Sequence, residues 1–294
     1  MIMAHRAGFV NILGNPNVGK STLMNALVGQ KLSIVSPKVQ TTRHRIMGIV
    51  NGEDYQIVYS DTPGILKPSY KLHETMLKSV KTAITDADIL IYITDINETF
   101  EKNEEVMKKL SKTSVPVLLL INKIDLAAAG QVEKMIPEWQ AILPNAQVFA
   151  ISALKEFNLD GLLSRIQELL PESPAYYPKD DLSDRNERFF VSEIIREKIF
   201  FNYREEIPYS CEVVIESFEE ENTIIRIGAI IYVARDSQKG IIIGNKGAAL
   251  KKTGTQARLD IEKFLGKKVF LQLLVKESKD WRNVDRKLKE FGYQ

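Results

Sequence analysis

Apolar positions in the first 170 residues fall into short runs that alternate with stretches of helical spacing. Five runs rich in large apolar side chains predict buried strands over residues 7–13, 55–60, 88–94, 115–121 and 147–151. Apolar residues spaced by about 3.6 positions predict helices over residues 21–28, 72–85, 101–110, 132–143 and 158–170. Strands and helices that alternate in this way are typical of an α/β domain, with a mostly parallel sheet covered on both faces.

One pair of β-rich runs has a different connection. Residues 45–50 and 55–60 are separated by a short polar segment that begins with Asn51 and Gly52. An Asn-Gly pair between two such runs is a strong signal for a β-hairpin. We therefore expect a hairpin inside the otherwise alternating domain.

The pattern changes after residue 170. Residues 171–181 contain three prolines and few aliphatic side chains, which indicates a semi-extended linker. Beyond it, the predicted order is a helix over 187–203, strands over 211–218 and 223–233, a short apolar helical segment ending at 243, a helix to about 265, and a strand over 268–275. A basic helix is predicted over 281–291. We expect two domains, residues 1–170 and an α+β domain over 185–294, joined by a linker over 171–184.

Residues 14–21, Gly-Asn-Pro-Asn-Val-Gly-Lys-Ser, lie between the first predicted strand and the first predicted helix. They match the P-loop pattern, in which backbone N–H groups and a helix N-terminus bind phosphate. Lys20 is expected to reach the β- and γ-phosphates, and the Ser21 hydroxyl to hold Mg²⁺. The expected phosphate contacts in this segment are Asn15, Pro16, Asn17, Val18, Gly19, Lys20, Ser21 and Thr22.

Two later segments complete a predicted triphosphate site. Asp61 follows the strand over 55–60 and can hold Mg²⁺, while the N–H of Gly64 can reach the γ-phosphate. In the polar loop over 30–43, either Thr41 or Thr42 can add a hydroxyl to Mg²⁺; we favour Thr42. The catalytic candidates beside the γ-phosphate are Lys20, Thr42 and Gly64.

The next two strand ends predict a guanine site. In the segment 122–125, the Asp125 carboxylate can accept hydrogen bonds from guanine N1–H and the N2 amino group, whereas adenine offers N1 as an acceptor. Lys123 would lie along the base, and the Ala153 N–H would donate to guanine O6. The predicted guanine contacts are Asn122, Lys123, Asp125, Ser152, Ala153 and Leu154.

Composition narrows the protein class. The chain is 44% hydrophobic and 27% charged, as in ordinary globular proteins, and no apolar run approaches the roughly 18 residues of a membrane span. The single cysteine, Cys211, excludes an internal disulfide and a Cys-rich metal site, and we expect a packed thiol there. With no secretory segment before the first strand, the expected location is the cytoplasm.

The C-terminal part of the chain suggests nucleic-acid binding. Residues 235–294 hold 15 Lys and Arg against 7 Asp and Glu. Within them, a Gly-x-x-Gly segment separates two predicted helices, and its glycines would let the backbone approach phosphates. Of the three isoleucines at 241–243, we expect most in the core and at most one against a base. The candidate nucleic-acid contacts are Ile241, Ile243, Gly244, Asn245, Lys246, Gly247, Lys251, Lys252 and Arg258.

The nucleotide motifs, in this order, resemble those of translation-factor-like P-loop GTPases. The order α-β-β-α-α-β with Gly-x-x-Gly between the middle helices resembles a type II KH domain, a module that binds single-stranded RNA. Together they resemble the Era family of bacterial GTPases over nearly the whole chain. The resemblance implies a GTP hydrolase, in which water attacks the γ-phosphate. It also implies that the protein binds 16S rRNA near the 3′ end of that RNA and acts in assembly of the small (30S) ribosomal subunit.

The resemblance also bears on catalysis and cofactors. Many GTPases have a water-orienting Gln directly after Asp-x-x-Gly, but this chain has Ile65, which resembles a subgroup with a hydrophobic replacement. We therefore expect slow intrinsic turnover. In relatives of that subgroup, an Asn at the position of Asn17 helps to bind K⁺, so K⁺ is a candidate cofactor beside Mg²⁺.

Two other classes of protein share some of these features. A P-loop kinase is disfavoured because the guanine signature is present and no set of residues for an acceptor substrate is evident. A GTP-dependent scaffold that docks proteins or a membrane surface through the basic C-terminal domain stays open, and would make the chain a peripheral membrane protein. His5, His44 and His73 have no metal-binding spacing.

Overall fold

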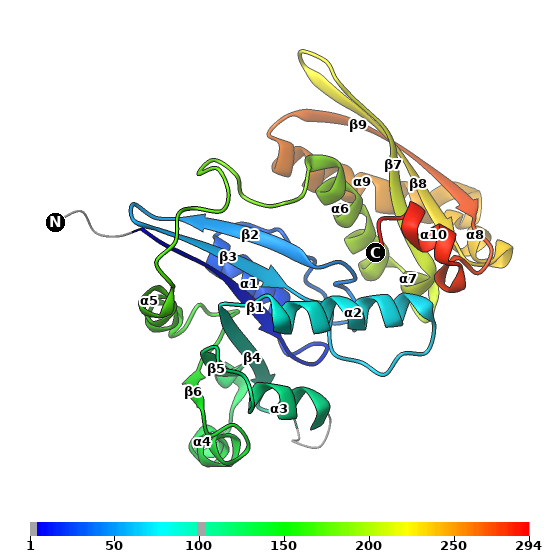
Figure 1. The fold of residues 1–294 in the computed structure, drawn as a ribbon. Coiled ribbons are helices and arrows are strands. Elements are labelled where there is room, and N and C mark those ends of the chain that lie inside the picture. Colours follow the sequence, from blue (N-terminus) through cyan, green and yellow to red (C-terminus); the bar gives the residue numbers. More distant parts are fainter. Residues whose placement is uncertain (1–4, 99–103, 294) are drawn as a thin grey trace. The chain divides into compact units, whose positions relative to one another are not determined.

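The computed structural model describes residues 5–98 and 104–293. The chain divides into two compact units (Figure 1). The first unit comprises Met1–Ser33, Thr42–Lys67 and Met76–Asp184, and the second comprises Ile34–Thr41, Pro68–Thr75 and Arg185–Gln294. Two short segments from the first half of the chain thus belong to the second unit.

The first unit is built on a six-stranded sheet with the order β2-β3-β1-β4-β5-β6. Its strands are β1 (Arg6–Leu13), β2 (Ile46–Asn51), β3 (Tyr55–Asp61), β4 (Ile89–Asp95), β5 (Val117–Asn122) and β6 (Ala146–Ala150). Only the β2–β3 pair is antiparallel, and the four other pairs are parallel. Both the mostly parallel sheet and the hairpin predicted from the sequence are confirmed.

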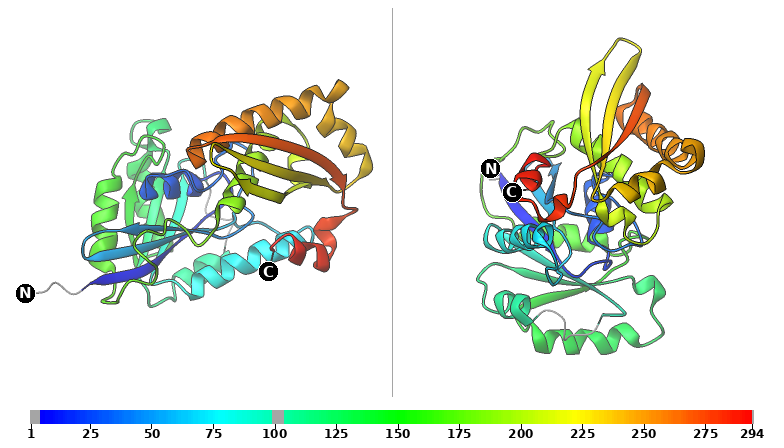
Figure 2. Two further views of the ribbon diagram at one scale, coloured as in Figure 1. Left: turned by 90° about the horizontal axis from the view of Figure 1, so that it is seen from above. Right: turned by 90° about the vertical axis from the view of Figure 1, so that its right-hand side faces the viewer.

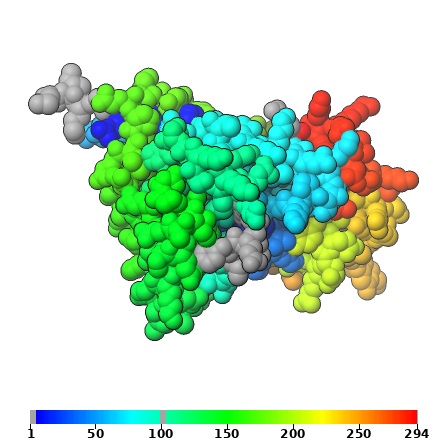
Figure 3. Space-filling model, turned by 60° about the horizontal axis from the view of Figure 1, so that its bottom comes forward, coloured from blue at the N-terminus to red at the C-terminus, as the bar shows by residue number. Residues whose placement is uncertain are grey.

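Helices cover both faces of this sheet. They are α1 (Lys20–Val28), α2 (Lys71–Thr85), α3 (Glu104–Leu110), α4 (Gln131–Ile142) and α5 (Leu159–Leu169). Apolar side chains of α2, α3 and α4 share one core cluster with β4 and β5, and α1 lies on the opposite face from α2 (Figures 1 and 2). Helices α2 and α3 lie side by side (Figure 3), where Lys81 Nζ is 3.9 Å from Glu105 Oε1. Residues 101–103 of the helix predicted over 101–110 lie outside the described residues.

The linker after α5 lies on the first unit. The Ile49 N–H of β2 donates to the Leu182 carbonyl over 2.9 Å. The Gln56 side-chain oxygen accepts from the backbone N–H groups of Tyr176 and Tyr177 over 2.7 and 3.0 Å. These bonds fix the proline-containing segment along the β2–β3 hairpin as an ordered part of that unit.

The second unit has a three-stranded sheet in the order β7-β8-β9, with β7 antiparallel and β9 parallel to β8. Its elements are α6 (Glu187–Asn202), α7 (Ile207–Ser210), β7 (Cys211–Glu220), β8 (Ile224–Val233), α8 (Asp236–Ile243), α9 (Ala248–Leu265), β9 (Lys268–Glu277) and α10 (Asp285–Glu290). The predicted order α-β-β-α-α-β is confirmed, with the short α7 added between α6 and β7. Figure 2 shows α9 running along the sheet.

The alternation of side chains along β8 explains why the helices pack on one face of this sheet. Ile225, Ile227 and Ile231 are buried on one face, where α6 contributes Ile195 and α9 contributes Ile261. Because side chains alternate along a strand, these odd-numbered positions all point toward the helices. The Cys211 thiol is buried in the same cluster, as expected.

The C-terminal segment differs from its prediction. The continuous helix expected over 281–291 is wrong: a 3₁₀ turn at Trp281–Asn283 and the short α10 are separated by Val284 in an extended conformation. The Trp281 ring is fully buried, and its Nε1–H donates to the Ser210 carbonyl over 2.9 Å. The chain buries this ring at the expense of a continuous helix. No helix of the described residues is long and apolar enough to cross a membrane.

Candidate functional site

The phosphate-binding loop requires glycine at two positions. A Cβ on Gly14 would lie 2.3 Å from the Ile93 carbonyl oxygen, and one on Gly19 would lie 2.2 Å from the Asn122 side-chain nitrogen. Gly19 also has φ 104°, which L-residues rarely adopt. The turn between β1 and α1 therefore packs against its neighbours with no space for side chains at these two positions.

Lys20 is buried beneath this loop. Its Nζ donates to the Gly14 and Asn15 carbonyl oxygens over 3.1 and 2.7 Å. Burial lowers the pKa of Lys20 to about 8, against the opposing attraction of Asp61 and Glu98. The ammonium group is thus poorly solvated, so its interaction with an anion in the loop is strong.

Three oxygen-bearing side chains converge beside Lys20. Ser21 Oγ donates to Asp61 Oδ2 over 2.7 Å and lies 2.9 Å from Thr42 Oγ1, which is 3.3 Å from the same carboxylate oxygen. Asp61 Oδ1 is buried, with no hydrogen-bond partner among the described residues. Burial is the main influence on the pKa of Asp61 and raises it. A hard cation such as Mg²⁺ fits this set, because it binds few protein oxygens and takes its other ligands from phosphate and water.

The loop after β3 approaches the phosphate-binding loop closely. A Cβ on Gly64 would lie 2.9 Å from the Pro16 nitrogen, and the Ile65 N–H donates to the Gly14 carbonyl over 3.1 Å. The Ile65 side chain packs against the core cluster of the first unit. Position 65 therefore supplies no polar group that could orient a water molecule.

The predicted guanine residues form one connected group. The Asn122 side chain donates to the Val18 carbonyl over 2.8 Å and accepts from the Ala153 N–H over 2.9 Å, so it ties the loop after β6 to the phosphate-binding loop. Ser152 Oγ donates to Asp125 Oδ1 over 2.6 Å, which orients the carboxylate. The Ala153 N–H, which the sequence predicts as a donor to guanine O6, has the Asn122 side chain as its acceptor in this structure, and its contact with guanine stays a prediction.

Lys123 has partners that the sequence did not indicate. Its Nζ donates to the Asn17 carbonyl and to Asp95 Oδ2, both over 2.6 Å. Asn15 likewise contacts Glu98 in the loop after β4. Asp95 and Glu98 were missed because no nucleotide motif includes them; the end of a parallel strand at the site was the available signal. Leu154 is 72% exposed beside this group.

The Gly-x-x-Gly segment forms a tight turn between α8 and α9. Lys246 and Gly247 have φ 49° and 80°, and a Cβ on Gly244 would lie 2.6 Å from the Ala249 Cβ. A Cβ on Gly247 would have no neighbour within 4 Å, so its backbone faces open space. A phosphate can approach the chain there without steric hindrance.

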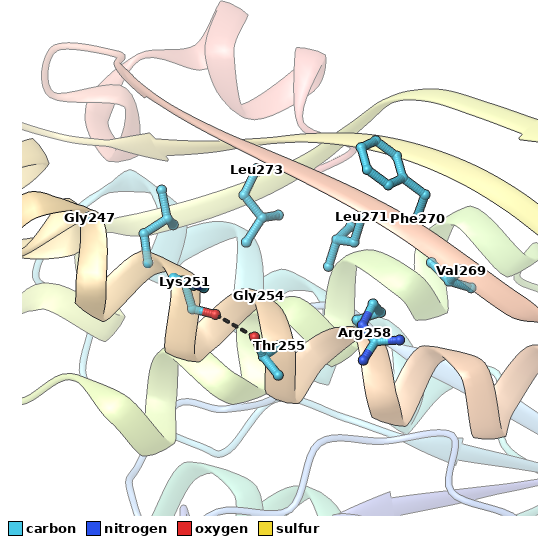
Figure 4. Close-up of a pocket in the computed structure, with 10 residues that line it drawn as sticks. Gly247, Lys251, Gly254, Thr255, Arg258, Val269, Phe270, Leu271 and Leu273 are labelled. Carbon is cyan, nitrogen blue, oxygen red and sulfur yellow. Dashed lines mark hydrogen bonds between the residues drawn. The ribbon is translucent and has the colours of Figure 1, made fainter.

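A groove of about 450 Å³ runs from this turn between α9 and β9 (Figure 4). Of the candidate RNA contacts, Gly247, Lys251 and Arg258 line it. The lining residues absent from the sequence prediction are Leu250, Gly254, Thr255, Val269, Phe270, Leu271 and Leu273. An apolar wall from β9, opposite cations on α9, suits unpaired bases with their phosphates.

The other candidate RNA contacts lie outside this groove. Among its described lining residues, neither Ile241 nor Ile243 appears; they are 52% and 38% exposed, while Ile242 is buried in the core. The expectation that most of these isoleucines join the core is therefore wrong. Helix α8 ends here and has a single buried face, which admits one of three consecutive residues. Lys252 is exposed, and Asn245 and Lys246 form the turn itself.

Glu262 orients the cation at the far end of the groove. It accepts from Arg258 Nη1 over 2.8 Å and from the Val269 N–H over 3.1 Å. The bond from Val269 is the main reason that the pKa of Glu262 is lowered, and Arg258 and Lys268 act in the same direction. One carboxylate thus links the start of β9 to Arg258.

Comparison with protein families matches both units. The model of the "50S ribosome-binding GTPase" family matches residues 9–123, and the model of the KH domain matches residues 206–282. The first match contains the phosphate-binding loop and extends to the start of the guanine segment, and the second contains the Gly-x-x-Gly turn.

Individual relatives match almost the whole chain. GTPase Era of Staphylococcus haemolyticus is 44% identical over 98% of this chain and 97% of its own length, and GTPase Era of Carboxydothermus hydrogenoformans is 43% identical over 99% of both. A crystal structure of Era with MgGDPNP and nucleotides 1506–1542 of 16S ribosomal RNA has a TM-score of 0.94 at 39% identity, covering 98% of this chain and 99% of that one. A variant of Aquifex aeolicus Era bound to GDP·AlF4⁻ has a TM-score of 0.93 at 38% identity, with the same coverage.

Proposed function

The chain belongs to the Era family of GTPases, and from that premise we propose that it hydrolyses GTP, binds 16S rRNA near the 3′ end and acts in assembly of the small (30S) ribosomal subunit. This proposal is best supported by two sites in one chain. The first is a guanine-nucleotide site whose loops are joined by side-chain hydrogen bonds, and the second is a KH groove with cations along one side. We place the GTP-binding domain at residues 1–170, the linker at 171–184 and the RNA-binding domain at 185–294. We propose the cytoplasm as its location, with any membrane contact peripheral.

In the proposed reaction, the chain binds GTP at the carboxyl edge of the first sheet. Residues 15–22 and Gly64 hold the phosphates, and Asn122, Lys123, Asp125 and residues 152–154 hold guanine. Ser21, Thr42 and Asp61 would hold Mg²⁺, which neutralises phosphate charge when bound. Lys20 stabilises the charge that develops on the γ-phosphate. Because position 65 is apolar, no side chain there orients the attacking water, which is consistent with a slow intrinsic rate.

We further propose that K⁺ stimulates hydrolysis through Asn17. This residue has φ 66° in the phosphate-binding loop, a conformation that glycine adopts freely. Substitution Asn17→Gly would therefore remove the amide while keeping the backbone. We expect the protein to hydrolyse GTP faster in KCl than in NaCl, and the Asn17→Gly variant to lose this difference. Equal rates in the two salts for the unsubstituted protein would rule K⁺ out.

RNA would enter the groove between α9 and β9. The backbone at Gly244–Gly247 would meet phosphates, with Asn245, Lys246 and Lys252 at the turn and Lys251 and Arg258 along the groove. Ile241 and Ile243 are exposed on α8, and one of them would contact a base from outside the groove. The proposal includes a switch, in which the GTP-bound form binds RNA more tightly than the GDP-bound form. Equal RNA affinities of the two forms would contradict it.

The test is crosslinking of the protein, bound to a GTP analogue, to cellular RNA, followed by sequencing. Gly247→Asp places a carboxylate at the proposed phosphate contact. Gly266→Asp is the matched control: Gly266 ends the same helix, has φ 66° against 80° for Gly247, and likewise faces open space. We expect reads at the 3′ end of 16S rRNA that vanish with Gly247→Asp and persist with Gly266→Asp.

Reads spread evenly over cellular RNA, or equal loss in both variants, would overturn the proposed RNA contact. The basic domain would then be a docking surface for protein or membrane. Co-sedimentation with ribosomes that survives nuclease treatment would identify that alternative.

A further inference from the structure

Helix α6 holds the segment Ile34–Thr41 through one buried cation. Arg196 Nη2 donates to the Thr41 carbonyl over 2.5 Å. Arg196 Nε and Nη2 also donate to the two carboxylate oxygens of Glu193, over 2.7 and 2.5 Å. The side chains of Arg196 and Glu193 are only 1% and 6% exposed. The guanidinium group therefore has one position, set by Glu193, from which it reaches Thr41.

This arrangement is costly if its only role is to stabilise the fold. Burying two charges away from water is costly, and an apolar pair of similar volume is often at least as stable. Arg196 Nη1 is buried and has no hydrogen-bond partner among the described residues, which adds to the cost. In some proteins a buried ion pair fixes a particular conformation, and here the group that Arg196 holds is the Thr41 carbonyl.

Other contacts hold the same segment. Lys38 Nζ donates to the Phe200 and Tyr203 carbonyl oxygens at the C-terminal end of α6, where a cation meets unpaired carbonyl groups and the negative end of the helix dipole. Gln40 has φ 58°, and its side-chain oxygen lies 3.0 Å from His73 Nε2. The segment is thus anchored at positions 38, 40 and 41, directly before Thr42.

The covalent chain connects this anchor to the nucleotide site. The Thr41 carbonyl and the Thr42 N–H belong to one planar peptide group, so fixing the carbonyl also fixes the start of Thr42. The Thr42 hydroxyl lies 2.9 Å from Ser21 Oγ and 3.3 Å from Asp61 Oδ2. A bond from Arg196 to the preceding carbonyl therefore restricts where this hydroxyl can lie.

We propose that Arg196, held in place by Glu193, is a positioning residue for the GTPase reaction, because it holds the Thr41–Thr42 peptide so that Thr42 reaches the Mg²⁺ that accompanies the γ-phosphate. The inference rests on the proposed function, specifically on the role of Thr42 at Mg²⁺. On the proposed function, Thr42 binds Mg²⁺ only when a γ-phosphate is present, so Arg196 strengthens binding of GTP and leaves binding of GDP unchanged.

The experiment compares Arg196→Gln with Arg188→Gln. Arg188 is an exposed arginine two turns earlier on α6, where its guanidinium carbon lies 5.7 Å from the Phe218 ring centre, and it serves as the matched control. Affinities for GDP and for a non-hydrolysable GTP analogue are measured with Mg²⁺, together with kcat and KM. For Arg196→Gln we expect about tenfold weaker analogue binding and a similar fall in kcat/KM, the size of one charge-assisted hydrogen bond. GDP affinity stays within about twofold of the unsubstituted value. Arg188→Gln changes none of these.

A double-mutant cycle with Thr42→Ala separates this inference from the proposed function. If Arg196 acts through Thr42, the loss from Arg196→Gln disappears in the Thr42→Ala background. Additive losses, or equal weakening of GDP and analogue, would overturn the inference. If Thr42→Ala alone leaves analogue binding unchanged, the proposed role of Thr42 fails, and the inference fails with it.

A further variant covers the outcome that Arg196→Gln does not fold. Lys38 is only partly buried, so Lys38→Met keeps much of its volume and removes the second anchor on α6. We expect it to weaken analogue binding selectively, by about threefold, with thermal unfolding as the check on folding. Unchanged analogue binding in a folded Lys38→Met protein would count against the inference.

Discussion

The nucleotide site and the RNA groove are built in contrasting ways. In the nucleotide site, polar side chains bond to the backbone of other loops: Asn122 alone links the Val18 carbonyl to the Ala153 N–H. In the groove, β9 forms an apolar wall, and the cations Lys251 and Arg258 lie along the α9 side. Nucleotide binding should therefore depend on individual hydrogen-bonding atoms, whereas RNA binding should depend on the shape and charge of the groove. The two should therefore respond differently to small substitutions.

The largest expected effect is at the guanine contact. Asp125→Asn replaces the carboxylate, which accepts two hydrogen bonds from guanine, by an amide that places a donor against one of them. We expect GTP affinity to fall by roughly 10⁴-fold, the size seen when a built hydrogen-bond partner is lost. Competition between GTP and xanthosine triphosphate measures this, because xanthine has an acceptor oxygen in place of the N2 amino group. Asp160→Asn, at an exposed position on α5, is the control, and a loss below tenfold would contradict the guanine assignment.

A smaller loss is expected from adding one methyl group at Gly64. The new Cβ would lie 2.8 Å from Pro16 Cγ and 2.9 Å from the Pro16 nitrogen, so the loop after β3 must move away from the phosphate-binding loop. We expect kcat of Gly64→Ala to fall by about 100-fold, as when one positioned backbone donor is lost, with GDP affinity largely kept. Single-turnover hydrolysis measures the rate. An unchanged rate would show that the Gly64 N–H does not act on the γ-phosphate.

The same methyl group at Gly254 tests the groove and should have a modest effect. Its Cβ would lie 3.2 Å from the Leu273 Cδ1, a flexible side chain that can shift. We expect Gly254→Ala to lower RNA affinity by about threefold while raising helix stability by up to ~1 kcal/mol. Gly240→Ala in α8 is the control, since its Cβ meets nothing within 4 Å. Gly240→Ala should raise the melting temperature by a similar amount without changing RNA affinity. An equal loss of RNA affinity in both variants would contradict RNA binding in the groove.

The smallest expected effect concerns acid stability of the groove. The folded-state pKa of Glu262 lies below its ordinary value of 4.5, so its stabilising contribution is present above pH 4.5 and is lost as pH falls through the folded value. Glu262→Gln removes this contribution. We expect the melting temperature of the variant to be lower near pH 7 and to converge with that of the unsubstituted protein near pH 3. A constant difference across this range would show that the carboxylate charge is not involved.

Sequence patterns determined most of the first unit. Alternation of apolar runs and helical spacing predicted the sheet and its helices, and local motifs placed Lys20, Asp61, Asn122 and Ser152 at strand ends. This worked because parallel strands bring their carboxyl ends to one edge, so that positions separated by over 100 residues meet without further information. The pattern of apolar positions also predicted the element order of the KH domain.

Tertiary structure alone decided the remaining features. The acceptor of the Ala153 N–H, the break at Val284 and the exposure of Ile241 and Ile243 each depend on neighbours from distant parts of the chain. The groove between α9 and β9 likewise required the strand register that places Leu273 beside Gly254.

The segment Ile34–Thr41 illustrates this division most clearly. Its sequence indicated a polar loop with two candidate threonines, of which we favoured Thr42, although the local pattern suits both. In the structure, the Thr41 carbonyl meets Arg196, whereas the Thr42 hydroxyl meets Ser21 and Asp61. A sequence states which groups can form hydrogen bonds, but only the folded chain selects their partners, because that choice depends on which distant residues are brought within about 3 Å.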